Sequence, residues 1–203
     1  MNWKINQEKL GIKRKKTFVE ERVMVKKWEV LDRKTVLEDK WIHIEASKCR
    51  LSDGTIIEPF YVNHIPDFAV IVPVTEEGNV VLVRQYRHGV EEVLLELPAG
   101  CMEAGEEPEM SARRELAEET GCTGGEWEFL FKLSPDASKS SNYAWCFLAK
   151  GVRRTQVQHL DETEELEIVE MPVSEVREAL DKGQFVQAVH AAALYAFLCR
   201  EKG

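Results

Sequence analysis

Apolar and polar positions alternate, or apolar positions run together, along much of the chain, and this pattern predicts strands. Residues 22–31 and 41–51 alternate in part, as half-buried strands do. Asp53-Gly54 separates two such segments and predicts a hairpin turn. Further strands are expected in the apolar or partly alternating segments 67–73, 80–83, 93–97, 127–133, 143–149 and 166–170.

Three segments carry helical signals instead. Pro108 suits a first helical turn, apolar residues follow it at helical spacing, and Gly121 is a natural stop. Ser174 can cap a helix over residues 175–181, and a last helix is expected over about residues 187–199. The order of strands, helix, strands and two helices favours an α/β fold with a mixed sheet flanked by helices, not a doubly wound parallel sheet.

The helix that starts at Pro108 gathers Glu115, Glu118 and Glu119 near its C-terminal end. On ideal helix geometry these three fall within an arc of roughly 100°. Glu115 and Glu119 repel each other at i,i+4, the helix dipole disfavours anions in the last turn, and only Arg114 is placed to pair with Glu118. A solvated acidic face would tolerate these small penalties. Alternatively, hard carboxylate oxygens at this spacing suit Mg²⁺ or Mn²⁺.

The residues around this helix favour the metal-binding interpretation. From Gly100 the sequence has five residues, Glu106, seven residues, and then Arg-Glu-Leu-Ala-Glu-Glu-Thr-Gly-Cys. This resembles the Nudix box, and all seven of its fixed letters match. At about one chance in 15 per letter, such a match arises by accident roughly once in 10⁸ windows. The chain is therefore identified as a member of the Nudix superfamily.

The resemblance implies a fold and a chemistry. Nudix domains fold as an α/β/α sandwich around a mixed sheet, and they hydrolyse nucleoside diphosphates linked to another moiety, with Mg²⁺ or Mn²⁺. By position in the box, Glu115 and Glu119 are the expected primary metal ligands, and Glu118 is a further ligand or catalytic carboxylate. Glu106 would be a second metal-site residue, and Arg114 would orient the carboxylates through charge-assisted hydrogen bonds.

Residues 81–100 (VLVRQYRHGVEEVLLELPAG) resemble the ADP-ribose and nucleotide-sugar pyrophosphatase branch of the family. That branch commonly has an RQYR-like strand end and an ELPAG entry to the box. By this resemblance, Ala99 offers its backbone carbonyl to a metal, and Glu96 lies near the site. Arg87, and less specifically Arg84, are expected to contact the substrate diphosphate. The alternative for both arginines is ordinary surface charge on a strand.

Two more stretches resemble this branch. The acidic loop, residues 159–165 (HLDETEE), precedes a strand, where the branch has its catalytic base. Glu164 and Glu162 are the candidates, and the spacing to the strand favours Glu164; a solvated loop is the alternative. The branch also has an N-terminal β-subdomain that forms dimers and clamps the base with aromatic rings. Trp41 and Trp28 are candidates for this stacking, although a strand Trp is often simply core.

Residues 133–149 (LSPDASKSSNYAWCFLA) depart from the branch. Ser134-Pro135 and the last three residues match, but 136–142 lack the Gly-rich turn and acidic residue that ADP-ribose enzymes often show. The substrate's distal group therefore stays open. Other substrates with the same chemistry are a dinucleoside polyphosphate, an NAD-type dinucleotide, coenzyme A or a nucleoside triphosphate. A non-catalytic nucleotide-sugar sensor is a third hypothesis, which the complete box disfavours.

Composition sets the remaining expectations. The 203 residues, 44% hydrophobic and 31% charged, fit a soluble globular protein. We divide the chain into a basic arm (1–20), an N-terminal β-subdomain (21–63) and a Nudix domain (64–203). The net charge of -9 disfavours a nucleic-acid partner and tolerates bound cations. Five cysteines without a CxxC pair predict reduced thiols in the cytoplasm, and no membrane span is expected.

Overall fold

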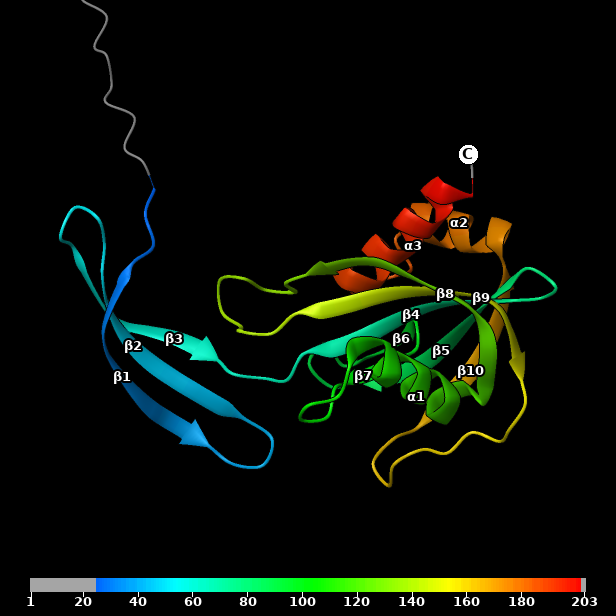
Figure 1. Cartoon of the computed structure of the whole chain (residues 1–203), viewed down its shortest axis with the longest axis horizontal. Coiled ribbons are helices and arrows are strands. Elements are labelled where there is room, and N and C mark those ends of the chain that lie inside the picture. Colours follow the sequence, from blue (N-terminus) through cyan, green and yellow to red (C-terminus); the bar gives the residue numbers. More distant parts are fainter. Residues whose placement is uncertain (1–24, 202–203) are drawn as a thin grey trace, which may run out of the picture.

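The N-terminal part of the computed structural model is a small antiparallel sheet with the strand order β1-β2-β3 (Figure 1). The structure describes residues 25–201, so the expected basic arm, 1–20, lies outside the described residues. The expected strand over 22–31 instead begins at Glu29, whereas the turn at Asp53-Gly54 is confirmed, with Gly54 at a φ of 88°. The strands are β1 (Glu29–Glu38), β2 (His43–Arg50) and β3 (Ile56–Asn63).

A seven-stranded sheet forms the body of the molecule, and it is mixed, as expected. Its main path has the order β10-β5-β4-β9-β8, with β6 beside β5 and β7 beside β4. β4 and β9 run parallel, and the other neighbours are antiparallel. The strands are β4 (Phe68–Thr75), β5 (Asn79–Arg87), β6 (Glu92–Glu96), β7 (Ala99–Cys101), β8 (Cys122–Leu133), β9 (Ala144–Arg154) and β10 (Leu166–Pro172).

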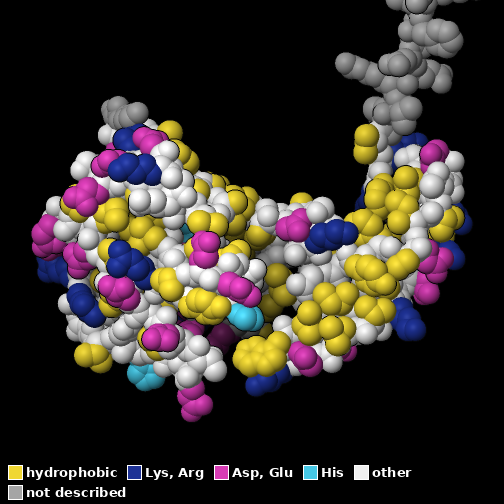
Figure 2. Space-filling view, turned by 180° about the vertical axis from the view of Figure 1, so that it is seen from behind, with side chains coloured by type: hydrophobic (Ala, Val, Ile, Leu, Met, Phe, Trp, Pro, Cys, Tyr) yellow, Lys and Arg dark blue, Asp and Glu magenta, His cyan; other side chains and the backbone are white. Residues whose placement is uncertain are grey.

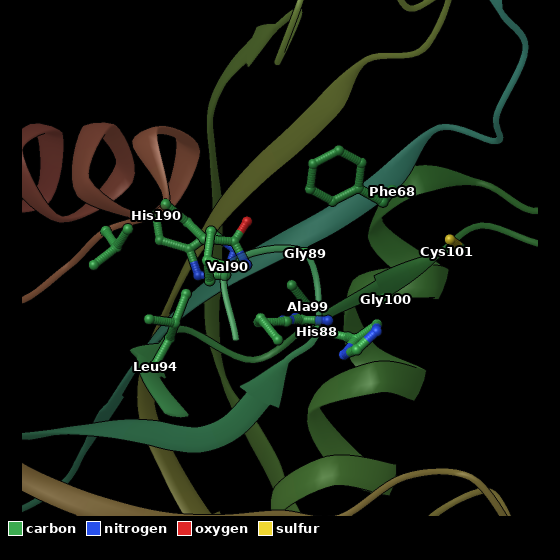
Figure 3. A pocket seen from close by; sticks show the side chains of 12 residues that line it. Phe68, His88, Gly89, Val90, Leu94, Ala99, Gly100, Cys101 and His190 are labelled. Atoms are coloured by element: carbon green, nitrogen blue, oxygen red, sulfur yellow. The ribbon is translucent and has the colours of Figure 1, made fainter. Parts of the chain in front are cut away.

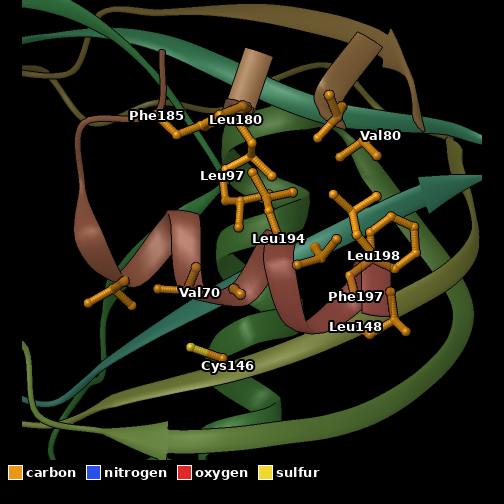
Figure 4. Packing of buried hydrophobic residues seen from close by; sticks show 14 of the residues in the cluster. Val70, Val80, Leu97, Cys146, Leu148, Leu180, Phe185, Leu194, Phe197 and Leu198 are labelled. Carbon is orange, nitrogen blue, oxygen red and sulfur yellow. The ribbon is translucent and has the colours of Figure 1, made fainter. Parts of the chain in front are cut away.

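Helices cover both faces of this sheet, giving the α/β/α sandwich that the Nudix resemblance implied (Figure 1). Neighbouring residues of β4 enter different cores, because successive strand side chains point to opposite faces. Ile71 packs with Leu116 of α1, whereas Val70 packs with Leu194 of α3 (Figure 4). Each is fully buried, which contributes about 1.5–3 kcal/mol per large side chain. The helices are α1 (Pro108–Thr120), α2 (Val173–Asp181) and α3 (Ala188–Arg200).

The helix ends confirm one sequence prediction and correct another. α1 starts at Pro108 and ends at Thr120, and it is followed by Gly121, whose φ of 71° is in the left-handed region that glycine tolerates. The prediction that Ser174 caps the next helix is wrong, because α2 already begins at Val173. β10 runs directly into this helix through Pro172, whose φ of -55° suits a helix start. Ser174 therefore lies inside the first turn.

A backbone contact joins the small sheet to the body of the molecule. Asn63, the last residue of β3, donates its N–H to the Lys139 carbonyl at 2.7 Å and accepts from the Ser141 N–H at 3.0 Å. The segment 136–142, which departs from the ADP-ribose enzymes in sequence, thus lies against the small sheet. Figure 2 shows hydrophobic side chains gathered over that sheet. The exposed ones are Trp28, Val30, Val36, Leu37, Trp41, Ile56 and Tyr61.

Candidate active site

Two glutamates of α1 are buried against the short strand β7. Glu115 is 8% exposed and Glu119 is 5% exposed. Glu119 Oε2 accepts the Ala99 N–H at 3.0 Å. A Cβ on Gly100 would lie 2.1 Å from the Glu115 carboxyl group, so the absence of a side chain there leaves room for this carboxylate. The structure therefore brings Ala99, Gly100, Glu115 and Glu119 together.

Arg114 lies at the centre of an acidic cluster. Its Nε and Nη2 each donate to a carboxylate oxygen of Glu106 at 3.0 Å. Its Nη1 donates to Glu115 at 2.7 Å and to Glu118 at 3.0 Å. The bonds from Arg114 hold the pKa of Glu106 at about 2, so Glu106 is ionised at neutral pH. Glu118 remains the most open of the three α1 carboxylates, with 45% of its side chain exposed.

The two buried carboxylates carry an electrostatic cost that a cation would relieve. Burial raises the pKa of Glu119 to about 8; the Ala99 N–H opposes this shift, and the charges of Glu115 and Glu164 add to it. Burial also raises the pKa of Glu115, against the opposing effect of Arg114. Closely spaced oxygen donors of this kind are the set that hard divalent cations prefer. The residues present thus fit a divalent metal ion.

In this structure the carboxylates of Glu106, Glu115 and Glu118 all point toward the Arg114 guanidinium. Within residues 25–201, no three His, Cys, Asp or Glu side chains converge in a metal-ligand geometry. Arg114 bonds to oxygens of both Glu115 and Glu118. These bonds go to Glu115 Oε1 and Glu118 Oε2, so Arg114 leaves the other oxygen of each carboxylate to a cation.

Arg87 is held by a buried carboxylate. Its Nε donates to Glu96 Oε1 at 2.9 Å and its Nη2 to Oε2 at 2.6 Å, a bidentate pair. Glu96 is 1% exposed, whereas 39% of the Arg87 side chain is exposed. Burial opposes ionisation of Glu96, but hydrogen bonds from Arg87 and Gln187 outweigh it, and the pKa of Glu96 lies below its usual value. Arg87 is therefore a cation in a defined orientation.

A cavity of about 560 Å³ lies beside these groups (Figure 3). His190 of α3 forms part of its wall, and its Nδ1 accepts the Leu97 N–H at 3.1 Å. Burial lowers the pKa of His190 to about 4, so its imidazole is neutral at physiological pH. The lining combines apolar and polar groups: Phe68, Arg87, His88, Gly89, Val90, Leu94, Ala99, Gly100, Cys101, Val186, Gln187 and His190.

The acidic loop connects β9 to β10 and lies close to the α1 carboxylates. The charge of Glu164 raises the pKa of both Glu115 and Glu119, so Glu164 is near both. Its N–H donates to the Asp161 carbonyl at 3.0 Å, and its Oε2 accepts the Asp161 N–H at 3.1 Å. Glu162 is also exposed, and its charge is not among the main causes of these two pKa shifts.

Three residues predicted to bind substrate make no described contact with the α1 carboxylates. Arg84 pairs with Glu167 of the neighbouring strand at 3.3 Å, and its side chain is 46% exposed. Trp28 packs edge-on against Phe60, with ring centroids 5.5 Å apart. Trp41 is 71% exposed and lies in the turn between β1 and β2. Neither Trp belongs to the core of the larger sheet.

Comparison with known proteins agrees with this geometry. The NUDIX domain family matches residues 65–190. The chain belongs to the Nudix family. A second family, the nucleoside diphosphate sugar hydrolase N-terminal domain, matches residues 28–63 of this Nudix protein. These residues are the small sheet and Trp28, which directly precedes it.

Individual relatives of the Nudix protein carry different names. It is 31% identical over 143 residues to the methanol dehydrogenase activator of Bacillus methanolicus, covering 69% of this chain and 76% of that protein. It is 28% identical over 177 residues to the ADP-ribose pyrophosphatase of Bacillus subtilis, covering 84% and 95%. A crystal structure of an ADP compounds hydrolase superposes with a TM-score of 0.79 at 26% identity, covering 89% of this chain and 97% of that one.

Sequence reasoning missed three polar residues of this region. Gln187 directly precedes α3, and His190 lies in its first turn. Both reach the cavity only because α3 packs on the sheet. Gln158 directly precedes the acidic loop, and its side chain contacts α1. A His within an apolar helix was the one visible signal; the two glutamines carried none.

Proposed function

We propose that this Nudix protein hydrolyses the diphosphate linkage of ADP-ribose or a related nucleoside diphosphate sugar. The products are a nucleoside monophosphate and a sugar phosphate. The observation that carries this proposal is the burial of Glu115 and Glu119 against Ala99-Gly100, within a complete Nudix box. The names of the relatives, an ADP-ribose pyrophosphatase and an ADP compounds hydrolase, support the choice of substrate.

The reaction uses Mg²⁺, with Mn²⁺ as a substitute. Glu115, Glu119 and the Ala99 carbonyl would hold the ion, with Glu118 as a further ligand and Glu106 in support through Arg114. When bound, a divalent cation neutralises phosphate charge and lowers the pKa of a bound water. Arg114 keeps the glutamates oriented through its fork of hydrogen bonds.

Glu164 is the general base that accepts the proton of the attacking water. Its influence on the pKa of Glu115 and Glu119 supports this choice over Glu162, whose charge is not among the main causes of those shifts. Its carboxylate is exposed, so a water can reach it. Before substrate binds, this carboxylate caps the turn at Asp161, a weak local contact that it can leave.

Arg87 binds the substrate diphosphate. Its bidentate pairing with Glu96 fixes the direction of the guanidinium, and its exposed part borders the cavity. Glu96 therefore acts by orienting Arg87. Arg84 plays at most a secondary part, since its exposed pair with Glu167 is an ordinary cross-strand contact.

The protein works as a homodimer formed through the small sheet, which is the role of residues 21–63. Three strands with exposed apolar side chains need a covering partner, because such a sheet buries too little surface alone. One face has a groove of about 350 Å³ that includes Trp28, Val30 and Phe60. In the dimer, Trp41, and less directly Trp28, stack on the substrate base.

The enzyme belongs in the cytoplasm. All five cysteines are free thiols, and three of them are buried, as in proteins of a reducing compartment. Among residues 25–201, no helix combines the length and apolar character that a bilayer crossing needs. The basic arm, 1–20, has no role assigned to it.

A different substrate is the main alternative. A dinucleoside polyphosphate, an NAD-type dinucleotide, coenzyme A or a nucleoside triphosphate would use the same carboxylates. The cavity favours a substrate with a moiety on both sides of the diphosphate, since it extends the site beyond the carboxylates. A nucleotide-sugar sensor would bind tightly without turnover, and the full carboxylate set argues against it.

A substrate panel tests the proposal. The full-length protein is incubated with Mg²⁺ and ADP-ribose, GDP-mannose, UDP-glucose, NADH, a diadenosine polyphosphate or a nucleoside triphosphate, and the products are separated by chromatography. We expect ADP-ribose or another nucleotide sugar to have the highest kcat/KM. A higher kcat/KM for the triphosphate would contradict the substrate proposal, and tight binding without any turnover would favour the sensor.

A further inference from the structure

The C-terminal end of α1 is covered by the chain segment that leads into the acidic loop. The last carbonyls of a helix lack partners within the helix and must find them elsewhere. Here the Glu118 carbonyl accepts the His159 N–H at 2.8 Å. The Glu119 carbonyl accepts from Gln158 Nε2 at 2.7 Å. The residues that carry two of the site's carboxylates thus anchor this segment through their backbones.

Gln158 makes a second contact that closes the base of the acidic loop. Its Nε2 also lies 3.4 Å from the carbonyl of Leu166, the first residue of β10. One side-chain amide therefore bridges the residue before the loop, the residue after it and the end of α1. In Figure 1 the loop runs between β9 and β10 and passes below α1. Gln158 is partly buried, whereas every residue from Asp161 to Glu165 is exposed.

This arrangement matters because the loop has few other attachments. Among the described contacts of residues 161–165, the hydrogen bonds are those between Asp161 and Glu164. Such bonds hold the turn together but do not fix it relative to α1. The Gln158 amide and the His159 N–H provide that fixation. A displacement of about 1 Å of a catalytic group can cost about 100-fold in rate.

We propose that Gln158 is a positioning residue that clamps the acidic loop to the C-terminal end of α1, so that Glu164 is held at a fixed place relative to Glu115 and Glu119. This rests on the proposed function, in which Glu164 is the base. The substrate contacts, which involve Arg87 and the cavity, do not pass through Gln158. Loss of the clamp therefore lowers kcat and leaves KM nearly unchanged.

The test compares Gln158→Met, which keeps the length of the side chain but removes both N–H donors, with Gln158→Arg, which retains donors. Arginine also suits a helix C-terminus. The control is Gln156→Met: this nearby side chain is exposed, and Gln156 meets the end of α1 through its backbone, whose N–H donates to the Gly121 carbonyl. The measurements are kcat and KM with Mg²⁺ and ADP-ribose, thermal unfolding, and hydrogen exchange of peptides covering 159–165.

For Gln158→Met we expect kcat to fall by about 10- to 100-fold, the range for loss of an orienting group, with KM within about twofold. Exchange rises in 159–165 and not in α1, Gln158→Arg retains most of the wild-type kcat, and Gln156→Met resembles wild type. Unchanged kcat and exchange in Gln158→Met would overturn the proposal, as would unfolding of the whole domain in that variant. If wild type turns over no substrate, the proposed function fails, and the exchange data alone still decide whether Gln158 holds the loop.

Discussion

Gly100 illustrates how a single residue sets the geometry of the site. Its missing side chain allows the Glu115 carboxylate to lie against β7, within the volume that a Cβ would occupy. Glu119 reaches the same strand through the Ala99 N–H. The box spacing places these groups on one side of α1, but the contact with β7 depends on how the strand crosses the helix. The sequence predicted that Glu115 and Glu119 share one side of the helix, and the structure shows why position 100 is glycine.

Substitution Gly100→Ala should lower activity more than stability. The atoms that a Cβ would meet belong to the flexible end of Glu115, which can swing away at little cost. We expect kcat with Mg²⁺ to fall by about 10- to 100-fold. The free energy of unfolding should change by less than about 1 kcal/mol, measured in urea without metal. A fully active Gly100→Ala protein would show that Glu115 is not needed in its observed position.

His190 should make stability depend on pH in a defined direction. Burial lowers its pKa from 6.5 to about 4, with Glu96 opposing and Arg87 adding to the shift. Between these two values the unfolded chain binds a proton that the folded protein does not, so stability falls as the pH decreases through this range. From pH 7 to pH 5 the contribution is about 2 kcal/mol.

The matched variant is His190→Asn, whose Oδ1 can still accept the Leu97 N–H but does not titrate. Urea unfolding at pH 7 and pH 5 should show a smaller loss of stability for this variant than for wild type. The same loss in both proteins would mean that His190 is protonated in the folded state or is not buried as described.

Helix α1 is the element on which sequence and structure agree best. Pro108, the apolar positions and Gly121 are all local signals, and both ends were predicted from them. Short β7 was not predicted, because three residues carry no periodicity and the strand exists only through its pairing with β4. The predicted cap at Ser174 is wrong for a similar reason. β10 ends at Pro172 and leads directly into the helix, so the helix begins one residue before Ser174.

Arg114 should stabilise the junction between α1 and the segment before it. Its Nη2 also donates to the Cys101 carbonyl at 3.1 Å, in addition to the Glu106 pair. Replacement Arg114→Ala should lower the free energy of unfolding by about 2 kcal/mol, the scale of hydrogen bonds to charged groups, and should weaken Mg²⁺ binding.

The control is Arg113→Ala, at the next position. Arg113 pairs with Glu109 at i,i+4, which contributes about 0.3–0.5 kcal/mol, and its guanidinium lies over the Trp127 ring at 4.4 Å, which contributes about 0.5–1 kcal/mol. Urea unfolding with and without Mg²⁺ compares the two variants. Equal losses would contradict a special role for Arg114.

At the scale of the whole molecule, the small sheet is the part that exposes several large apolar side chains. Its strands are joined to the body by a linker and the contact of Asn63 with Lys139 and Ser141, and several of its apolar side chains are exposed among residues 25–201. The sequence indicated these strands and their aromatic residues, but it did not show that Trp28 packs on Phe60 or that Trp41 is exposed. Those features depend on the pairing register of the strands, which the sequence pattern does not determine.

We expect a molar mass of about twice 23.3 kDa in light scattering after gel filtration. Val30→Asp, in the groove of the small sheet, should give a monomer with reduced activity, since a charge there opposes burial. Tyr61→Asp is the control, because residues 60 and 62 line the groove and Tyr61 points to the other face. A wild-type monomer, or a dimer in Val30→Asp, would contradict this interface.

The most direct test of the proposed metal-dependent active site is ADP-ribose turnover by wild type and by Glu119→Gln, each with Mg²⁺ and with EDTA. Glu119 is the most buried of the three α1 carboxylates, and burial raises its pKa because a charge there lacks solvent, so a nearby divalent cation would stabilise it. We predict AMP and ribose 5-phosphate from wild type with Mg²⁺, none with EDTA, and at least about a 100-fold lower kcat in Glu119→Gln with its thermal unfolding unchanged or raised. Metal-independent turnover, or a fully active Glu119→Gln protein, would contradict the assignment of this cluster as a metal-dependent active site.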